Sequence, residues 1–232
     1  SNNESAIEVV MSIISNFTPE CLVRAKVECD IDELEDPRIG MSGLEFATRI
    51  KRAVDIARVD KYRATTHNKG VMNAISSVAV ACGQDWRAIE AGCHAWSAHA
   101  NQQYSSMTKW AVNDDGDLVG SIETPMAVGI VGGASKVHPT AKANLAILGI
   151  DSANELASIM CAAGLAQNLG ALRALATNGI QTGHMKLHAR NMAVSAGAVG
   201  DEIEVVASRL QAHNGPKTQT TVKNILDELR SE

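Results

Sequence analysis

Four side chains have the types and the setting that charge stabilisation and proton transfer require: Arg63, Lys69, Asp85 and His184. Lys69 is flanked by polar groups and opens a segment that is otherwise apolar. We expect that segment to form a helix over about 69–82, since its apolar residues recur at helical spacing. A cation is unfavourable in the first turn of a helix, because the helix dipole is positive there. The position of Lys69 therefore suggests a function for its charge.

Asp85 follows Lys69 by sixteen residues, beyond a break at Gly83, and could approach it if the flanking helices pack antiparallel. A carboxylate within about 4 to 6 Å keeps a lysine protonated. A protonated lysine can stabilise an oxyanion that develops during a reaction. Each residue also has a plainer interpretation, because Lys69 can be a solvated cation and Asp85 a helix N-cap. Arg63 could bind a substrate carboxylate with its planar fork, or form a surface ion pair.

His184 and His188 are four residues apart and share one face of a predicted helix. They lack the glutamate of the H-E-x-x-H motif and an obvious third ligand, so we expect no metal site. Gly179 and Gly183 predict a hinge before this helix. His184 is therefore a candidate general acid whose position depends on a moving segment. No ligand cluster is evident among the other histidines, which are His67, His94, His99, His138 and His213.

Composition narrows the class of protein. The 232 residues carry a net charge of −5 with no block of like charge, which argues against a nucleic-acid partner and a polybasic membrane patch. No apolar run approaches the length of about 20 residues that spans a bilayer, and the first residues do not resemble a secretion signal. The five cysteines form no C-x-x-C pair, which indicates buried thiols in a reducing compartment. We therefore expect a cytoplasmic protein.

Periodicity predicts an α+β fold that is mostly helical. Ile7, Val10, Met11 and Ile14 have the spacing of one helix face, and residues 21–31 alternate as a half-buried strand. Residues 110–123 predict a hairpin about Asp115 and Gly116, since they do not fit a calcium loop. The remaining predicted helices cover about 44–57, 85–96, 141–148, 154–177, 184–196 and 222–229.

Five segments, in chain order, are RATTHNKGVMN (63–73), CGQDWRAIEAGCHA (82–95), IETPMAVGIVGGASKVHP (122–139), GLAQNLGALRALATNGIQTGHMKLHARN (164–191) and GDEI (200–203). Together they resemble class II 3-hydroxy-3-methylglutaryl-CoA (HMG-CoA) reductase. The resemblance covers essentially the whole chain. The separation of Lys69 and Asp85 is similar to that of the bacterial and archaeal class.

The resemblance implies a four-electron reduction of HMG-CoA to mevalonate and CoA, with NADH or NADPH as the cofactor. It implies that Lys69 stabilises the oxyanion, that Asp85 is its partner and that His184 protonates the departing CoA thiolate. Arg63 matches the arginine that binds the HMG carboxylate. The remaining site residues implied by the motifs are Asn73, Gln167 and Asn168 in the substrate pocket and Asn16 at the cofactor. NADH and NADPH are equally compatible with these residues.

The resemblance also implies a domain organisation. Residues 1–20 are similar to the end of the small NAD(P)-binding domain, 21–177 to the second part of the large HMG-CoA-binding and dimerisation domain, and 178–232 to a C-terminal helical flap. The sequence has no E-N-x-x-G motif with a catalytic glutamate and no D-A-M-G-A-N nucleotide loop. We therefore expect this chain to be inactive alone.

The partners that the resemblance implies are HMG-CoA or CoA, the missing N-terminal half and a second copy, in a homodimer or a larger assembly of dimers. The alternative is a non-catalytic CoA-binding or assembly module that keeps the fold but has lost reduction. A zinc hydrolase that uses His184 and His188 is a third interpretation. Neither nucleic acid nor a membrane is expected as a partner.

Overall fold

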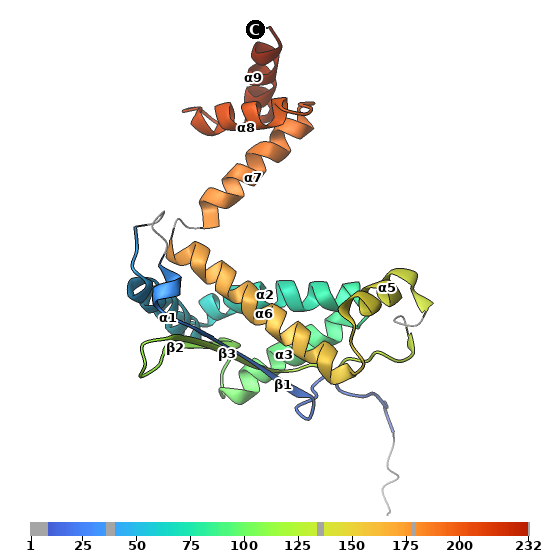
Figure 1. The fold of residues 1–232 in the computed structure, drawn as a ribbon. Helices are drawn as coiled ribbons and strands as arrows, with labels where there is room; N and C mark the ends of the chain where they lie inside the picture. Colours follow the sequence, from blue (N-terminus) through green and yellow to red (C-terminus); the bar gives the residue numbers. More distant parts are fainter. Residues whose placement is uncertain (1–8, 36–39, 134–136, 178–179, 232) are drawn as a thin grey trace, which may run out of the picture. The chain divides into compact units, whose positions relative to one another are not determined.

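A three-stranded antiparallel sheet, in the order β1-β3-β2, is built from β1 (Leu22–Cys29), β2 (Thr108–Val112) and β3 (Leu118–Pro125). The structure is a computed structural model that describes residues 9–35, 40–133, 137–177 and 180–231, without the side chains of residues 180–184 and 186. It divides into two compact units, Ser1–Arg173 and Ala174–Glu232. The described residues are mostly helical, which confirms the predicted α+β class (Figure 1).

The predicted hairpin between β2 and β3 is confirmed. Gly116 has a φ of +96°, a conformation that glycine adopts without strain, and its N–H donates to the carbonyl of Asn113 at 3.1 Å. Because side chains alternate along a strand, Trp110 and Gly120 face each other on the buried side of the sheet. Lys109 and Ser121 pair on the opposite, more open side.

Helices of the first unit carry most of its buried apolar side chains. Their bounds are α1 (Gly43–Val59), α2 (Lys61–Ala81), α3 (Trp86–Ala100), α5 (Pro139–Leu148) and α6 (Ala153–Ala176), with a short 3-10 turn, η1 (Asp32–Leu34). The fully buried members include Ile50 of α1, Ile75 of α2 and Met160 of α6. This core holds α2, the helix that carries three of the predicted site residues.

Glycine allows α6 to approach α2 closely. A Cβ atom at Gly164 would lie 2.8 Å from Cδ1 of Ile75, so only a residue without a side chain fits at this crossing. Among the described residues, α6 is the one helix long and apolar enough to cross a membrane, which the sequence analysis did not anticipate. Within the chain, eight of its residues are buried, including Leu156 and Leu172.

The predicted helix face at the N-terminal end is wrong for the described residues. Residues 9–14 have no regular secondary structure, and Val10, Met11 and Ile14 are 82%, 76% and 92% exposed. An amphipathic helix depends on burial of its apolar face for most of its stability. The part of the chain that the structure describes offers these residues no such surface.

The second unit is a three-helix cluster of α7 (Ile180–Ser195), α8 (Glu202–Ala212) and α9 (Gln219–Ser231). Its core is Ala189, Met192, Ala193, Ala198, Val206, Ala207, Leu210, Val222, Ile225 and Leu226. Arg230 of α9 donates to Glu202 at 2.8 Å and to the carbonyl of Gly197 at 3.0 Å, which ties α9 to the start of α8. The unit therefore has a core of its own.

Candidate active site

Arg63, Lys69 and Asn73 all lie on α2, which begins at Lys61 rather than near Lys69. Asp60 caps this helix by accepting a hydrogen bond from the N–H of Tyr62 at 2.9 Å. Lys69 therefore lies in the third turn, and the expectation that it opens a helix is wrong. The dipole argument for its charge consequently no longer applies.

The polar run before Lys69 is helical because its inward side chains find partners in the core. Asn68 is fully buried, donates to the carbonyl of Ser105 at 2.8 Å and accepts from the N–H of Met107 at 2.9 Å. The opposite face of the helix stays open. Lys69 and Asn73, four residues apart, are both exposed there and lie one turn from each other.

Arg63 is half-buried, and burial lowers the pKa of its guanidinium below the usual range. It makes no hydrogen bond or ion pair with another residue in the part of the chain that the structure describes. A partly desolvated cation without a partner favours an anionic ligand. Arg63 is therefore well suited to bind a carboxylate.

Asp85 and Lys69 do not meet within one chain, although α2 and α3 pack antiparallel as expected. The register follows from two hydrogen bonds, Ser76 to Glu90 at 3.0 Å and Asn68 to Ser97 at 3.4 Å. Asp85 caps α3 next to the end of α2 at Ala81, where its side chain accepts from Ala88 at 3.1 Å.

Twelve residues of α2 separate Lys69 from Ala81, which corresponds to about 18 Å along the helix. Helical side chains lean toward the N-terminus of their helix, so Lys69 leans away from Asp85. The expectation of an ion pair inside one chain is therefore wrong. A site that uses both residues needs a second copy of the chain.

Asn168 belongs to the core instead of lining a pocket. It is 2% exposed, and its amide oxygen accepts from Trp110 Nε1 at 2.9 Å and from Thr108 Oγ1 at 3.0 Å. Its neighbour Gln167 is exposed. The substrate role implied for Asn168 is therefore corrected to a structural one, whereas Gln167 remains available to a ligand.

His184 lies in α7 by its backbone, but its side chain is outside the described residues. The predicted hinge glycine Gly179 is also outside them, and Gly183 lies within the helix. His188 is exposed. The role of His184 as general acid stays a prediction.

Asn16 is exposed beside a small pocket of about 50 Å³ whose wall includes Gly92 and Pro125. Ligand sites usually occupy about 300 to 1,000 Å³. This pocket is too small for a dinucleotide, so the described residues around Asn16 do not form a nicotinamide-cofactor site by themselves.

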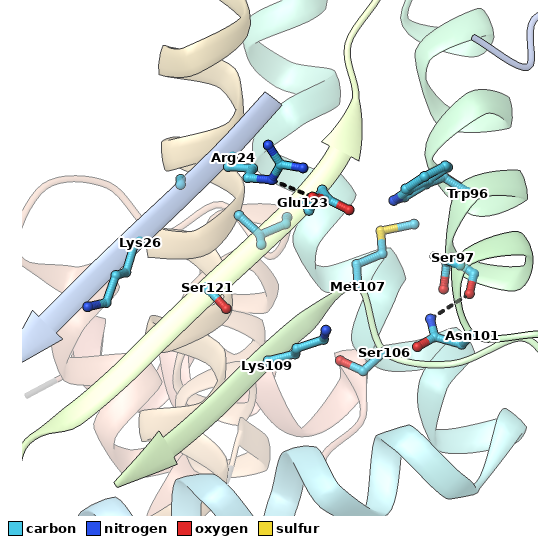
Figure 2. A pocket seen from close by; sticks show the side chains of 13 residues that line it. Arg24, Lys26, Trp96, Ser97, Asn101, Ser106, Met107, Lys109, Ser121 and Glu123 are labelled. Atoms are coloured by element: carbon cyan, nitrogen blue, oxygen red, sulfur yellow. Dashed lines mark hydrogen bonds and ion pairs between the residues drawn. The ribbon is translucent and has the colours of Figure 1, made fainter. Parts of the chain in front are cut away.

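A larger pocket of about 530 Å³ lies between the open side of the sheet and α3 (Figure 2). Arg24 and Glu123 form an ion pair at its edge, and Lys109 and Asn101 lie on its wall. It contains none of the site residues expected from the sequence. Among the described residues, no group of three His, Cys, Asp or Glu side chains is arranged to hold a metal ion.

Sequence reasoning missed His67, which is 3% exposed and hydrogen-bonded to Thr108 at 2.7 Å. Burial, with a smaller contribution from the charge of Arg63, lowers its pKa to about 4. The sequence did offer one signal, which is that His67 lies between Arg63 and Lys69. Its hydrogen-bond partners, however, are distant in sequence, so its burial could not be predicted. His67 is therefore neutral at physiological pH.

Comparison with known proteins agrees with these features. The hydroxymethylglutaryl-coenzyme A reductase family matches residues 2–189. The 3-hydroxy-3-methylglutaryl-coenzyme A reductase of Archaeoglobus fulgidus is 47% identical over 224 residues, which are 97% of this chain and 49% of the relative. A probable 3-hydroxy-3-methylglutaryl-coenzyme A reductase of Borreliella burgdorferi is 35% identical over 185 residues, 80% of this chain and 42% of the relative.

Solved structures give the same result. The class II 3-hydroxy-3-methylglutaryl-CoA reductase of Streptococcus pneumoniae bound to NADPH in open conformations has a TM-score of 0.67 at 38% identity, over 93% of this chain and 51% of that one. A second structure of the Streptococcus pneumoniae enzyme has a TM-score of 0.69 at 38% identity, over 95% and 52%. The chain spans about half the length of the curated relatives it matches. On this evidence the chain belongs to the hydroxymethylglutaryl-coenzyme A reductase family, to whose C-terminal half it corresponds.

Proposed function

We propose that this chain supplies substrate-binding and catalytic side chains to a class II HMG-CoA reductase. The reaction converts HMG-CoA, two NAD(P)H and two protons into mevalonate, CoA and two NAD(P)⁺. The observation that carries the proposal is the set of open side chains on α2, where Lys69 and Asn73 are exposed one turn apart and half-buried Arg63 has no anionic partner among the described residues. Family membership supplies the reaction class.

Lys69 would act on the thioester carbonyl. As this carbonyl is reduced, negative charge builds on its oxygen, and an ammonium group within hydrogen-bond distance stabilises that charge. Loss of one such donor typically lowers the rate by about 10² to 10³. Arg63 would bind the terminal carboxylate of the HMG group and so fix the position of the carbonyl relative to Lys69.

His184 would donate a proton to the sulfur of CoA as the carbon–sulfur bond breaks. A thiol has a pKa of about 8.5, so an imidazolium is acidic enough to protonate the corresponding thiolate. The resulting thiol no longer attacks the aldehyde. Asp85 would lie beside Lys69 and keep the amine charged.

The nicotinamide cofactor is not assigned to residues of this chain. The pocket at Asn16 is too small for it, and the expected nucleotide loop is absent from the sequence. We propose that the half present in full-length relatives binds the cofactor. Its choice between NADH and NADPH would then be made there.

A second copy of the chain would complete the site. About 18 Å along α2 separate Lys69 from the end of this helix that lies next to Asp85. We therefore propose that Lys69 of one copy pairs with Asp85 of another. This arrangement implies a homodimer or an assembly of dimers, and we propose the cytoplasm as its location.

The direct test is Lys69→Ala in the complete protein, which joins this chain with the half that full-length relatives carry. NAD(P)H consumption with HMG-CoA should fall by at least about 10². Lys142→Ala, at an exposed lysine of α5, is the matched control and should keep normal turnover. Near-normal turnover of Lys69→Ala would remove Lys69 from the mechanism. Binding of HMG-CoA without any reduction by the unaltered protein would favour the non-catalytic module.

A further inference from the structure

His67 lies at the junction of three elements of the first unit. Its Nε2 atom is 2.7 Å from Thr108 Oγ1 on β2 and 3.2 Å from the amide nitrogen of Asn168 on α6. Thr108 is fully buried, and its hydroxyl also lies 3.0 Å from Asn168 Oδ1. His67 therefore connects α2 to both β2 and α6.

One donor of this network is fixed by chemistry. Trp110 Nε1–H can only donate, so Asn168 Oδ1 must be the acceptor of their 2.9 Å contact. Asn168 Nδ2 therefore faces His67 Nε2 at 3.2 Å, while Thr108 Oγ1 lies 2.7 Å from Nε2 and 3.0 Å from Asn168 Oδ1. A neutral imidazole thus shares a hydrogen bond with Thr108 or Asn168 through Nε2, and the tautomer decides which atom donates.

The other ring nitrogen of His67 has no role in the network. Nδ1 is buried and has no hydrogen-bond partner among the described residues. A proton added there would be a buried, unpaired donor next to the charge of Arg63. The site therefore keeps the imidazole neutral.

This network bears on substrate binding through the helix. Arg63 is one turn before His67 on α2, close enough for its charge to disfavour protonation of the imidazole. Gln167 is similarly placed on α6, since it is the neighbour of Asn168 in the sequence. Because the hydrogen-bonded core fixes α2 and α6 against β2, it also fixes the positions of Arg63 and Gln167.

We propose that His67 is a positioning residue for HMG-CoA: its Nε2 hydrogen bond to Thr108 holds α2 in the register that aims Arg63 at the substrate carboxylate. This inference rests on the proposed function. Interactions that bind ground state and transition state alike change KM rather than kcat. Loss of the Nε2 hydrogen bond should therefore raise KM for HMG-CoA about tenfold and change kcat less, with KM for NAD(P)H unaltered.

Two variants of the complete protein separate positioning from mere packing. In His67→Gln the amide nitrogen reaches the place of Nε2, whereas in His67→Asn it reaches only the place of Nδ1. We expect His67→Gln to keep KM for HMG-CoA within about threefold of normal and His67→Asn to show the full increase. Equal KM values in both variants, or a normal KM in His67→Asn, would overturn the role.

A second pair keeps the test valid if His67→Asn does not fold. Thr108→Ser retains the hydroxyl and should behave normally, whereas Thr108→Val removes it and should raise KM for HMG-CoA in the same way. Equal KM values in this pair would overturn the role.

Equilibrium binding of HMG-CoA is measured beside turnover. An unaltered protein that neither binds nor reduces HMG-CoA refutes the proposed function itself, whereas an active protein with indifferent variants refutes only the role of His67.

Discussion

Gly120→Ala should destabilise the first unit substantially, because Trp110 lies over Gly120 on the buried face of the sheet. A Cβ atom at Gly120 would lie 2.5 Å from Cη2 and Cζ3 of Trp110 and 2.8 Å from its Cε3. The ring is 4% exposed, and its Nε1 donates to Asn168. It therefore cannot move without loss of that hydrogen bond.

The magnitude follows from two terms. Overpacking of a core costs about 1 to 3 kcal/mol, and an unsatisfied buried polar group costs about 1 to 3 kcal/mol. The free energy of unfolding should therefore fall by about 2 to 6 kcal/mol.

Urea unfolding followed by tryptophan fluorescence measures this effect, since Trp86, Trp96 and Trp110 all lie in the first unit. Gly170→Ala is the control. Gly170 is on α6 with nothing within 4 Å of an added Cβ, so this variant should gain about 0.5 to 1 kcal/mol from helix propensity. If Gly120→Ala is as stable as Gly170→Ala, the reasoning about the ring is refuted.

Two further predictions concern the same core. The pKa of His67 is about 4 in the fold, against an ordinary 6.5, so its stability contribution is complete above about pH 6.5 and is lost as the pH falls toward 4. The unfolding free energy should thus drop by about 2 kcal/mol between about pH 7 and pH 5, and His67→Gln should remove that part of the pH dependence in urea titrations. Gly164→Ala should cost about 1 to 3 kcal/mol because its Cβ would lie 2.8 Å from Cδ1 of Ile75, and added Ile75→Val, which deletes that atom, should restore part of the loss; no restoration would show that the crossing is limited elsewhere.

Local patterns in the sequence predicted elements whose stability is local. Asp85 was predicted as a helix N-cap, and its side chain does cap α3. The hairpin at Asp115 and Gly116 was likewise predicted from its turn chemistry. In both cases the residues that determine the element are neighbours in sequence.

Two errors came from interactions that no local pattern reveals. The start of α2 was placed too late because Asn68 reads as an exposed polar residue, whereas it is buried by bonds to Ser105 and Met107. Asn168 was assigned to a ligand for the same reason. Its partners lie about sixty residues earlier, where only the fold brings them close.

The helix α8 was overlooked although its signal was present. Ile203, Val206, Ala207 and Leu210 recur at the spacing of one helix face, and three of them are buried in the second unit. The suggested approach of Lys69 to Asp85 inside one chain failed for a different reason. The prediction that α2 and α3 pack antiparallel was correct, but α2 is so long that Lys69 lies about three turns from the end of the helix next to Asp85.

The most direct test of the central claim is complementation between two inactive variants of the complete protein, Lys69→Ala and Asp85→Ala. In a symmetric dimer whose sites combine Lys69 of one copy with Asp85 of the other, a mixed dimer has one intact site and one that lacks both groups. Mixed dimers isolated by two different affinity tags should therefore recover about half of the normal HMG-CoA reduction. Activity no greater than that of either parent variant would contradict the account.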